Sequence, residues 1–119
     1  MEHRTLLIIR KPPIGSVDAF EALRLSLSFY AADAPVEILL EGAGVLNWLA
    51  GMKTNSKDPL SVCRLVKDIE RFDIPVFLLE EDLADYGLNQ HDLASLHPKI
   101  ISRDEATNLL FANETTISV

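Results

Sequence analysis

The sequence contains a single cysteine, Cys63, among its 119 residues. One thiol excludes an intramolecular disulfide and a cysteine-rich zinc site, and it leaves one candidate for thiol chemistry. The histidines, His3, His91 and His97, form no H-x-x-x-H pair. We therefore predict no metal site.

Long hydrophobic runs are also absent. The apolar segment at 6–9 is far shorter than the roughly 20 residues that span a bilayer. The N-terminus lacks the small-residue cleavage site of a secretory signal. We therefore expect a cytoplasmic protein, and the length fits one domain, 1–119, around a single core.

Basic side chains are few, since 11 Lys and Arg stand against 18 Asp and Glu and give a formal net charge of −7. Such a balance repels nucleic acid and anionic membranes unless basic residues gather on one face. No run of Lys and Arg indicates a patch of that kind. Neither nucleic acid nor a membrane is expected as a partner.

Apolar runs alternate with helical patterns along the whole chain. The runs are continuous, as is typical of strands covered on both faces of a parallel sheet. Strands are expected at 6–9, 36–40, 74–79, 99–102 and 115–119, and helices at 17–32, 45–50, 59–72, 80–86, 89–96 and 104–111, with a surface loop at 51–57. Parallel strands joined by helical crossovers predict an α/β fold, a three-layer α/β/α sandwich with a mostly parallel five-stranded sheet.

The first corner of this fold, K-P-P-I-G-S at 11–16, lacks the glycine patterns of a dinucleotide site and of a P-loop. Nucleotide binding, and any other cofactor, is therefore not predicted. Two interpretations remain. Ser16 and the N–H groups behind it bind a small anion with help from Arg10 or Lys11, or Ser16 simply caps a helix after a turn stiffened by two prolines.

The second corner, E-G-A-G-V at 41–45, also allows two interpretations. Gly42 and Gly44 let a ligand or a neighbouring subunit approach the backbone, or they serve turn geometry alone. Trp48, the only tryptophan, follows this corner. A large aromatic residue there is either a core side chain or an interface anchor, and we favour the interface.

Four carboxylates, Glu80, Glu81, Asp82 and Asp85, follow the third strand. They suit a divalent cation or acid–base chemistry. Acidic residues in the first turn of a helix are also stabilised by the helix dipole without any ligand, and we favour that interpretation because no histidine spacing accompanies them.

Cys63 lies about 120° around its helix from the apolar stripe, at about 100° per residue. The thiol is therefore expected at the margin of the helix, partly exposed or facing another subunit. It also lies beyond the first turn, where the helix dipole activates a thiol most. A structural cysteine is the simpler interpretation, and a catalytic, sulfur-carrying Cys63 is the alternative.

The order of four segments resembles the DsrE/DsrF-like family of small sulfur-relay proteins, most closely its TusC/DsrF branch. The segments are R-K-P-P-I-G-S, E-I-L-L-E-G-A-G-V, V-F-L-L-E-E-D-L-A-D-Y-G-L and I-I-S-R-D-E-A. The resemblance implies an α/β sandwich that assembles into trimers or hexamers. It also implies, in active members, a persulfide-carrying cysteine at the end of the strand before the D-L-x-x-x-G-L-like segment, a position that Leu79 or a direct neighbour holds here.

Three functions follow as hypotheses. The first is a non-catalytic, oligomer-forming subunit of a sulfur-relay system whose catalytic thiol comes from another chain. The second is a sulfurtransferase-like carrier that uses Cys63, and the third is a small-anion or ligand binder at Ser16, Gly42 and Gly44. Expected partners are further copies in a homo-oligomer, related subunits in a hetero-oligomer, or sulfur-relay proteins, because a terminal strand at 115–119 leaves a sheet edge open.

Overall fold

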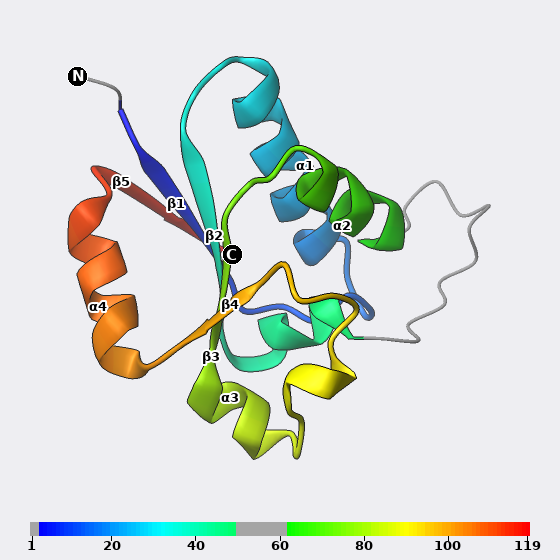
Figure 1. Ribbon diagram of the computed structural model, residues 1–119. Helices are drawn as coiled ribbons and strands as arrows, with labels where there is room; N and C mark the ends of the chain where they lie inside the picture. Colours follow the sequence, from blue (N-terminus) through cyan, green and yellow to red (C-terminus); the bar gives the residue numbers. More distant parts are fainter. Residues whose placement is uncertain (1–2, 50–61) are drawn as a thin grey trace.

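The computed structural model describes residues 3–49 and 62–119, which form a five-stranded sheet between two layers of helices (Figure 1). All neighbouring strands are parallel, in the order β4-β3-β2-β1-β5. The three-layer sandwich is thus confirmed, with a sheet that is wholly parallel. The elements are β1 (Thr5–Ile9), α1 (Asp18–Ala31), β2 (Val36–Leu40), η1 (Gly42–Trp48), α2 (Val62–Arg71), β3 (Val76–Leu79), α3 (Glu80–Asp85), η2 (Gln90–Asp92), β4 (Lys99–Ile101), α4 (Arg103–Ala112) and β5 (Thr115–Ser118).

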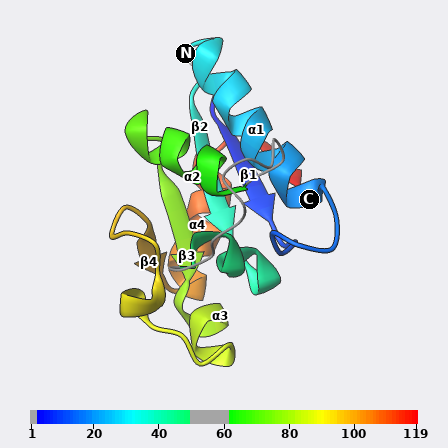
Figure 2. The ribbon, with the colours of Figure 1, turned by 90° about the vertical axis from the view of Figure 1, so that its right-hand side faces the viewer.

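The two faces of the sheet carry different layers. Helices α1 and α2 lie side by side on one face (Figure 2), and α4 covers the other face (Figure 1). Side chains alternate along each strand, so Leu7 and Ile9 of β1 pack in the larger core beneath α1 and α2, while Leu6 and Ile8 pack in the smaller core beneath α4. Both faces of β1 are buried, which explains its continuous apolar sequence.

Two expected helices differ in the structure. The segment at 89–96 forms only the 3₁₀ turn η2, because Leu93 then extends to pair with Leu49 and the amide of Ala94 donates to the carbonyl of Trp48 at 2.7 Å. The segment at 42–48 is a 3₁₀ helix that begins earlier than expected. The loop expected at 51–57 and the helix start expected at 58–59 lie outside the described residues.

The prediction that Ser16 caps the first helix is wrong by one residue. Helix α1 begins at Asp18, with Val17 at the N-cap and no side chain bonded there. The hydroxyl of Ser16 accepts a long hydrogen bond, 3.3 Å, from the amide of Asp18. Val17 and Tyr30, near the two ends of the helix expected at 17–32, are exposed.

Helices α1 and α2 end in the same way. Asp33 and Asp73 adopt left-handed backbone angles, with φ of 60° and 58°. The amide of the next residue then reaches back one turn, Ala34 to the carbonyl of Phe29 and Ile74 to that of Ile69. This Schellman geometry usually places glycine at the left-handed position, since glycine has no Cβ penalty there. Aspartate therefore costs stability at both helix ends, and its charge opposes the negative end of the helix dipole.

Replacing Asp33 by glycine should stabilise the protein. The change Asp33→Gly removes the left-handed strain and the carboxylate at the end of α1, and we expect a gain of about 1 kcal/mol, or a rise of about 4 °C in melting temperature. Ala32→Gly, one residue earlier at φ −86°, is the control and should lower the melting temperature. If both variants changed the melting temperature equally, the left-handed strain and the carboxylate at Asp33 would not be the cause.

Candidate functional site

The carboxyl edge of the sheet is built around a close approach between β1 and η1. A Cβ on Gly44 would overlap the carbonyl oxygen of Ile9 and come within 2.7 Å of its carbonyl carbon. The same carbonyl accepts the amide of Glu41 at 3.1 Å. The Nδ2 of Asn47 holds the next segment by donating to the carbonyl of Lys11 at 2.9 Å. The backbone of β1 therefore requires a glycine at position 44. No ligand is needed to explain the missing side chain.

The other glycine of this corner is held by a carboxylate. The amide of Gly42, at φ +57°, donates to Oδ2 of Asp82 at 2.7 Å. This bond fastens α3 to η1 and fills the position at which an external anion would accept from the same amide. The fold thus explains the role of Asp82, one of the four acidic residues that follow the third strand.

A second acidic residue of α3 has a partner as well. Glu81 accepts from Nε of Arg103 at 2.7 Å, and this hydrogen bond raises the pKa of that guanidinium above its ordinary value. The part of the chain that the structure describes contains no group of three His, Cys, Asp or Glu side chains arranged to hold a metal ion.

The candidate anion corner at Ser16 is open to solvent. Ser16 is exposed, and no hydrogen bond among the described residues joins it to Gly42 or Gly44. Arg10 turns to the neighbouring strands instead, since its Nε lies 3.0 Å from Oε1 of Glu41 and its Nη1 contacts Ser118. Arg10 is therefore engaged by Glu41 and Ser118, and an anion site at Ser16, Gly42 and Gly44 stays a prediction.

Trp48 is part of the core. Its side chain is 0% exposed, and Nε1 donates to Oε1 of Glu70 at 2.9 Å. The hydroxyl of Ser95 contacts the same carboxylate oxygen. The prediction that Trp48 anchors an interface is therefore wrong, because a side chain without exposed surface has none to offer a partner and its polar N–H is satisfied internally.

Cys63 lies half-buried on α2, as its position beside the apolar stripe predicts. It lines a hollow of about 200 Å³ together with Asn47, Lys67 and Glu70. Among the described residues, Oδ1 of Asn47 has no hydrogen-bond partner although the residue is buried. Sequence reasoning missed Asn47 and Glu70 here because they come from different elements, and no spacing in the sequence connects them.

Leu79 occupies the last position of β3, where the family resemblance implies the persulfide cysteine of active members. Its side chain is fully buried in the core beneath α4, beside Leu39 and Ile101. The next residue, Glu80, is exposed and begins α3. The strand end therefore presents no thiol at this edge, only a packed aliphatic side chain.

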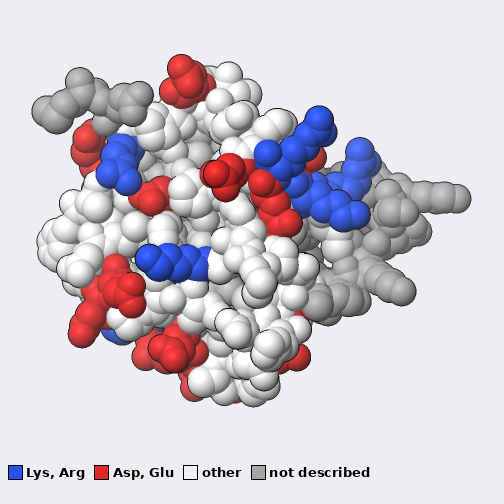
Figure 3. Space-filling view, viewed as in Figure 1, with Lys and Arg blue, Asp and Glu red and all other residues white. Residues whose placement is uncertain are grey.

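The charged surface agrees with the composition. On the face seen in Figure 3, acidic side chains are spread widely, and the largest basic group lies over α2 with acidic residues beside it. Among the described residues, no helix has both the length and the apolar character needed to cross a membrane.

Gly44 provides a direct test of the packing at this edge. The change Gly44→Ala should destabilise the protein by about 3 kcal/mol or more, because backbone atoms of β1 must move to admit the methyl group. Gly42→Ala is the matched control. Nothing lies within 4 Å of its Cβ position, so only the left-handed strain of about 1 kcal/mol applies. Urea unfolding measures both, and equal losses would refute the close-approach argument.

Comparisons with known proteins identify the fold. No family model matches the chain, and neither does any curated protein sequence. Among solved structures, the ychN protein from E.coli matches with a TM-score of 0.85 and 16% identity, covering 100% of both chains. MTH1491 from Methanobacterium thermoautotrophicum, a protein of unknown function, matches with a TM-score of 0.69 and 14% identity, covering 99% of this chain and 100% of that one. The chain therefore shares the α/β fold of these two proteins.

Proposed function

We propose that this chain is a non-catalytic, oligomer-forming DsrE/DsrF-like protein of a sulfur-relay system. The fold that the chain shares with the ychN protein and with MTH1491 supports this family. The observation that carries the non-catalytic role is the burial of Leu79, since a leucine enclosed in the core cannot take up or pass on sulfur. In this proposal the catalytic thiol belongs to another chain, and this protein contributes structure and contact surface.

A second candidate function rests on Cys63. The thiol lines a hollow beside Lys67 and Glu70, with the unpartnered Oδ1 of Asn47 nearby. A hollow of this kind admits the end of a sulfur donor, and a lysine ammonium stabilises a thiolate or persulfide anion. Cys63 would then carry sulfur from a position on α2, away from the end of β3.

Exposure to a persulfide donor separates the two functions. If the chain is non-catalytic, mass spectrometry of the intact protein should show no stable gain of a sulfur atom, and Cys63→Ser should behave identically. Gain of one sulfur atom by the wild-type chain but not by Cys63→Ser would contradict the non-catalytic role and support the carrier. The serine variant should keep its melting temperature, because a half-buried thiol on a helix margin contributes little packing.

Assembly, the other half of the proposal, needs an exposed apolar surface. With Trp48 in the core, the best supported surface lies at α4 and β5. Phe111 is 85% exposed and Leu110 lies beside it, and β5 forms an open edge of the sheet. Within 3–49 and 62–119, α4 is the only helix on this face of the sheet. A second copy or a related subunit that packed against it would extend the smaller core.

Light scattering measures the assembly directly. We expect a mass that is a multiple of 13.2 kDa, most simply a trimer or hexamer, and Phe111→Asp should shift it towards the monomer because a buried aspartate at a contact is costly. Leu96→Asp is the matched control, since Leu96 is 82% exposed in the segment before β4. A wild-type mass near 13.2 kDa would contradict the homo-oligomer and leave assembly with a related chain.

A further inference from the structure

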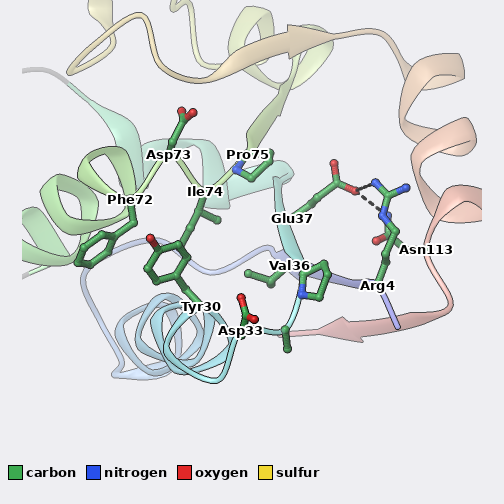
Figure 4. Close-up of a pocket in the computed structure, with 12 residues that line it drawn as sticks. Arg4, Tyr30, Asp33, Val36, Glu37, Phe72, Asp73, Ile74, Pro75 and Asn113 are labelled. Carbon is green, nitrogen blue, oxygen red and sulfur yellow. Dashed lines mark hydrogen bonds and ion pairs between the residues drawn. The ribbon is translucent and has the colours of Figure 1, made fainter. Parts of the chain in front are cut away.

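A groove of about 310 Å³ crosses the amino edge of the sheet, opposite the carboxyl edge described above (Figure 4). The residues just before β1, β3 and β5 form it, together with the segment 33–37 that leads into β2, Tyr30 in the last turn of α1 and Phe72 just after α2. Its volume is at the lower end of the range for small-molecule sites. The groove is separate from Cys63, from Leu79 and from the glycine corner.

The groove is rich in hydrogen-bond acceptors and in negative charge. Its lining contains three carboxylates, Asp33, Glu37 and Asp73, against one cation, Arg4. That cation is already engaged, since Nη2 of Arg4 lies 3.0 Å from Oε1 of Glu37. The two remaining aspartates stand at the carboxyl ends of α1 and α2, where the helix dipoles add further negative potential.

One acceptor in the lining is buried and lacks a donor. Asn113 is 8% exposed, and its Nδ2 donates to Oε1 of Glu37 at 3.1 Å and to the carbonyl of Leu109 at 2.9 Å. Its Oδ1 has no partner among the described residues. Figure 4 places Asn113 next to Arg4 and Glu37 at one end of the groove. Leaving a buried acceptor unsatisfied is costly, so a ligand that brings a donor to this end would recover that cost.

An aromatic pair forms the other end. The rings of Tyr30 and Phe72 stack at 4.7 Å between centroids and 16° between planes, and both remain partly exposed. The guanidinium carbon of Arg71 lies 6.0 Å from the centre of the Phe72 ring. Arg71 already holds the cation position beside Phe72, so the exposed aromatic surface is suited to a flat apolar body rather than to a second cation.

From these observations we propose that the groove binds a small organic ammonium ion with a flat apolar body. The ammonium group lies between Asp33 and the end of the groove at Asn113 and donates to the Asp33 carboxylate and to Oδ1 of Asn113. The apolar body packs along Tyr30 and Pro35. This site is independent of the sulfur-relay proposal, because none of its residues belongs to the strand end at Leu79 or to the hollow at Cys63. It also gives a reason for aspartate, rather than glycine, at the left-handed end of α1.

Titration of the full chain with phenethylammonium tests the site, with phenylacetate as a ligand of similar size and opposite charge. Phenethylammonium should bind saturably at one site, and the amide NMR signals that move should cluster at 30–37 and 72–75. Phenylacetate should give no saturable change. Asp33→Asn keeps a residue that tolerates the left-handed conformation and should weaken binding about fivefold through loss of one charge pair. Asp85→Asn, on α3, is the control and should leave binding unchanged.

Several results would overturn the site. These are the absence of saturable binding, equal binding of phenylacetate, or signal shifts centred away from the groove. Equal affinities of Asp33→Asn and the wild type would overturn it as well. The shift map uses the wild-type protein alone, so it decides the location even where a variant folds poorly. Asn113→Leu offers an additional check, because it removes the unpartnered acceptor and should also weaken binding.

Discussion

The approach of β1 to the η1 segment fixes the geometry of the whole carboxyl edge. Because the carbonyl of Ile9 lies against Gly44, the chain after β2 must turn tightly and run back beneath the sheet. That turn brings Trp48 into the core and leaves the amide of Gly42 facing Asp82 of α3. One close contact between backbones thus determines where the tryptophan, the acidic helix and the first corner lie.

The polar groups at the carboxyl and amino edges of the sheet have different partners. Parallel sheets commonly bind their ligands at the carboxyl edge. Here the amide of Gly42 is bound by Asp82, and the guanidinium of Arg10 is paired with Glu41. At the amino edge, acceptors outnumber donors and Oδ1 of Asn113 is unpaired among the described residues. Oδ1 of Asn47 at the carboxyl edge is unpaired as well, so the amino edge differs in combining an unpaired acceptor with carboxylates that outnumber the cations of the groove lining.

Local signals in the sequence predicted the elements well, and they failed where a partner lies far along the chain. Apolar runs predicted β1, β2 and β3, since burial on both faces leaves a direct trace in composition, and β-branched residues predicted β5. Trp48 was misplaced because its partner, Glu70, is on another helix. The helix expected at 89–96 was lost to a pairing between Leu93 and Leu49. The groove was missed for the same reason, because its residues come from the ends of several separate elements.

The pairing of β5 with β1 has a consequence for the order of folding. β1 lies between β2 and β5, so the first strand of the domain is completed by the last. Until β5 pairs with it, one edge of the largely apolar β1 is unpaired, and bringing strands so far apart in sequence together carries an entropic cost. A partly folded chain that lacks β5 therefore exposes an unpaired edge of β1, which is open to aggregation. Protection of that nascent edge by a chaperone would matter more for this protein than for one whose neighbouring strands follow each other in sequence.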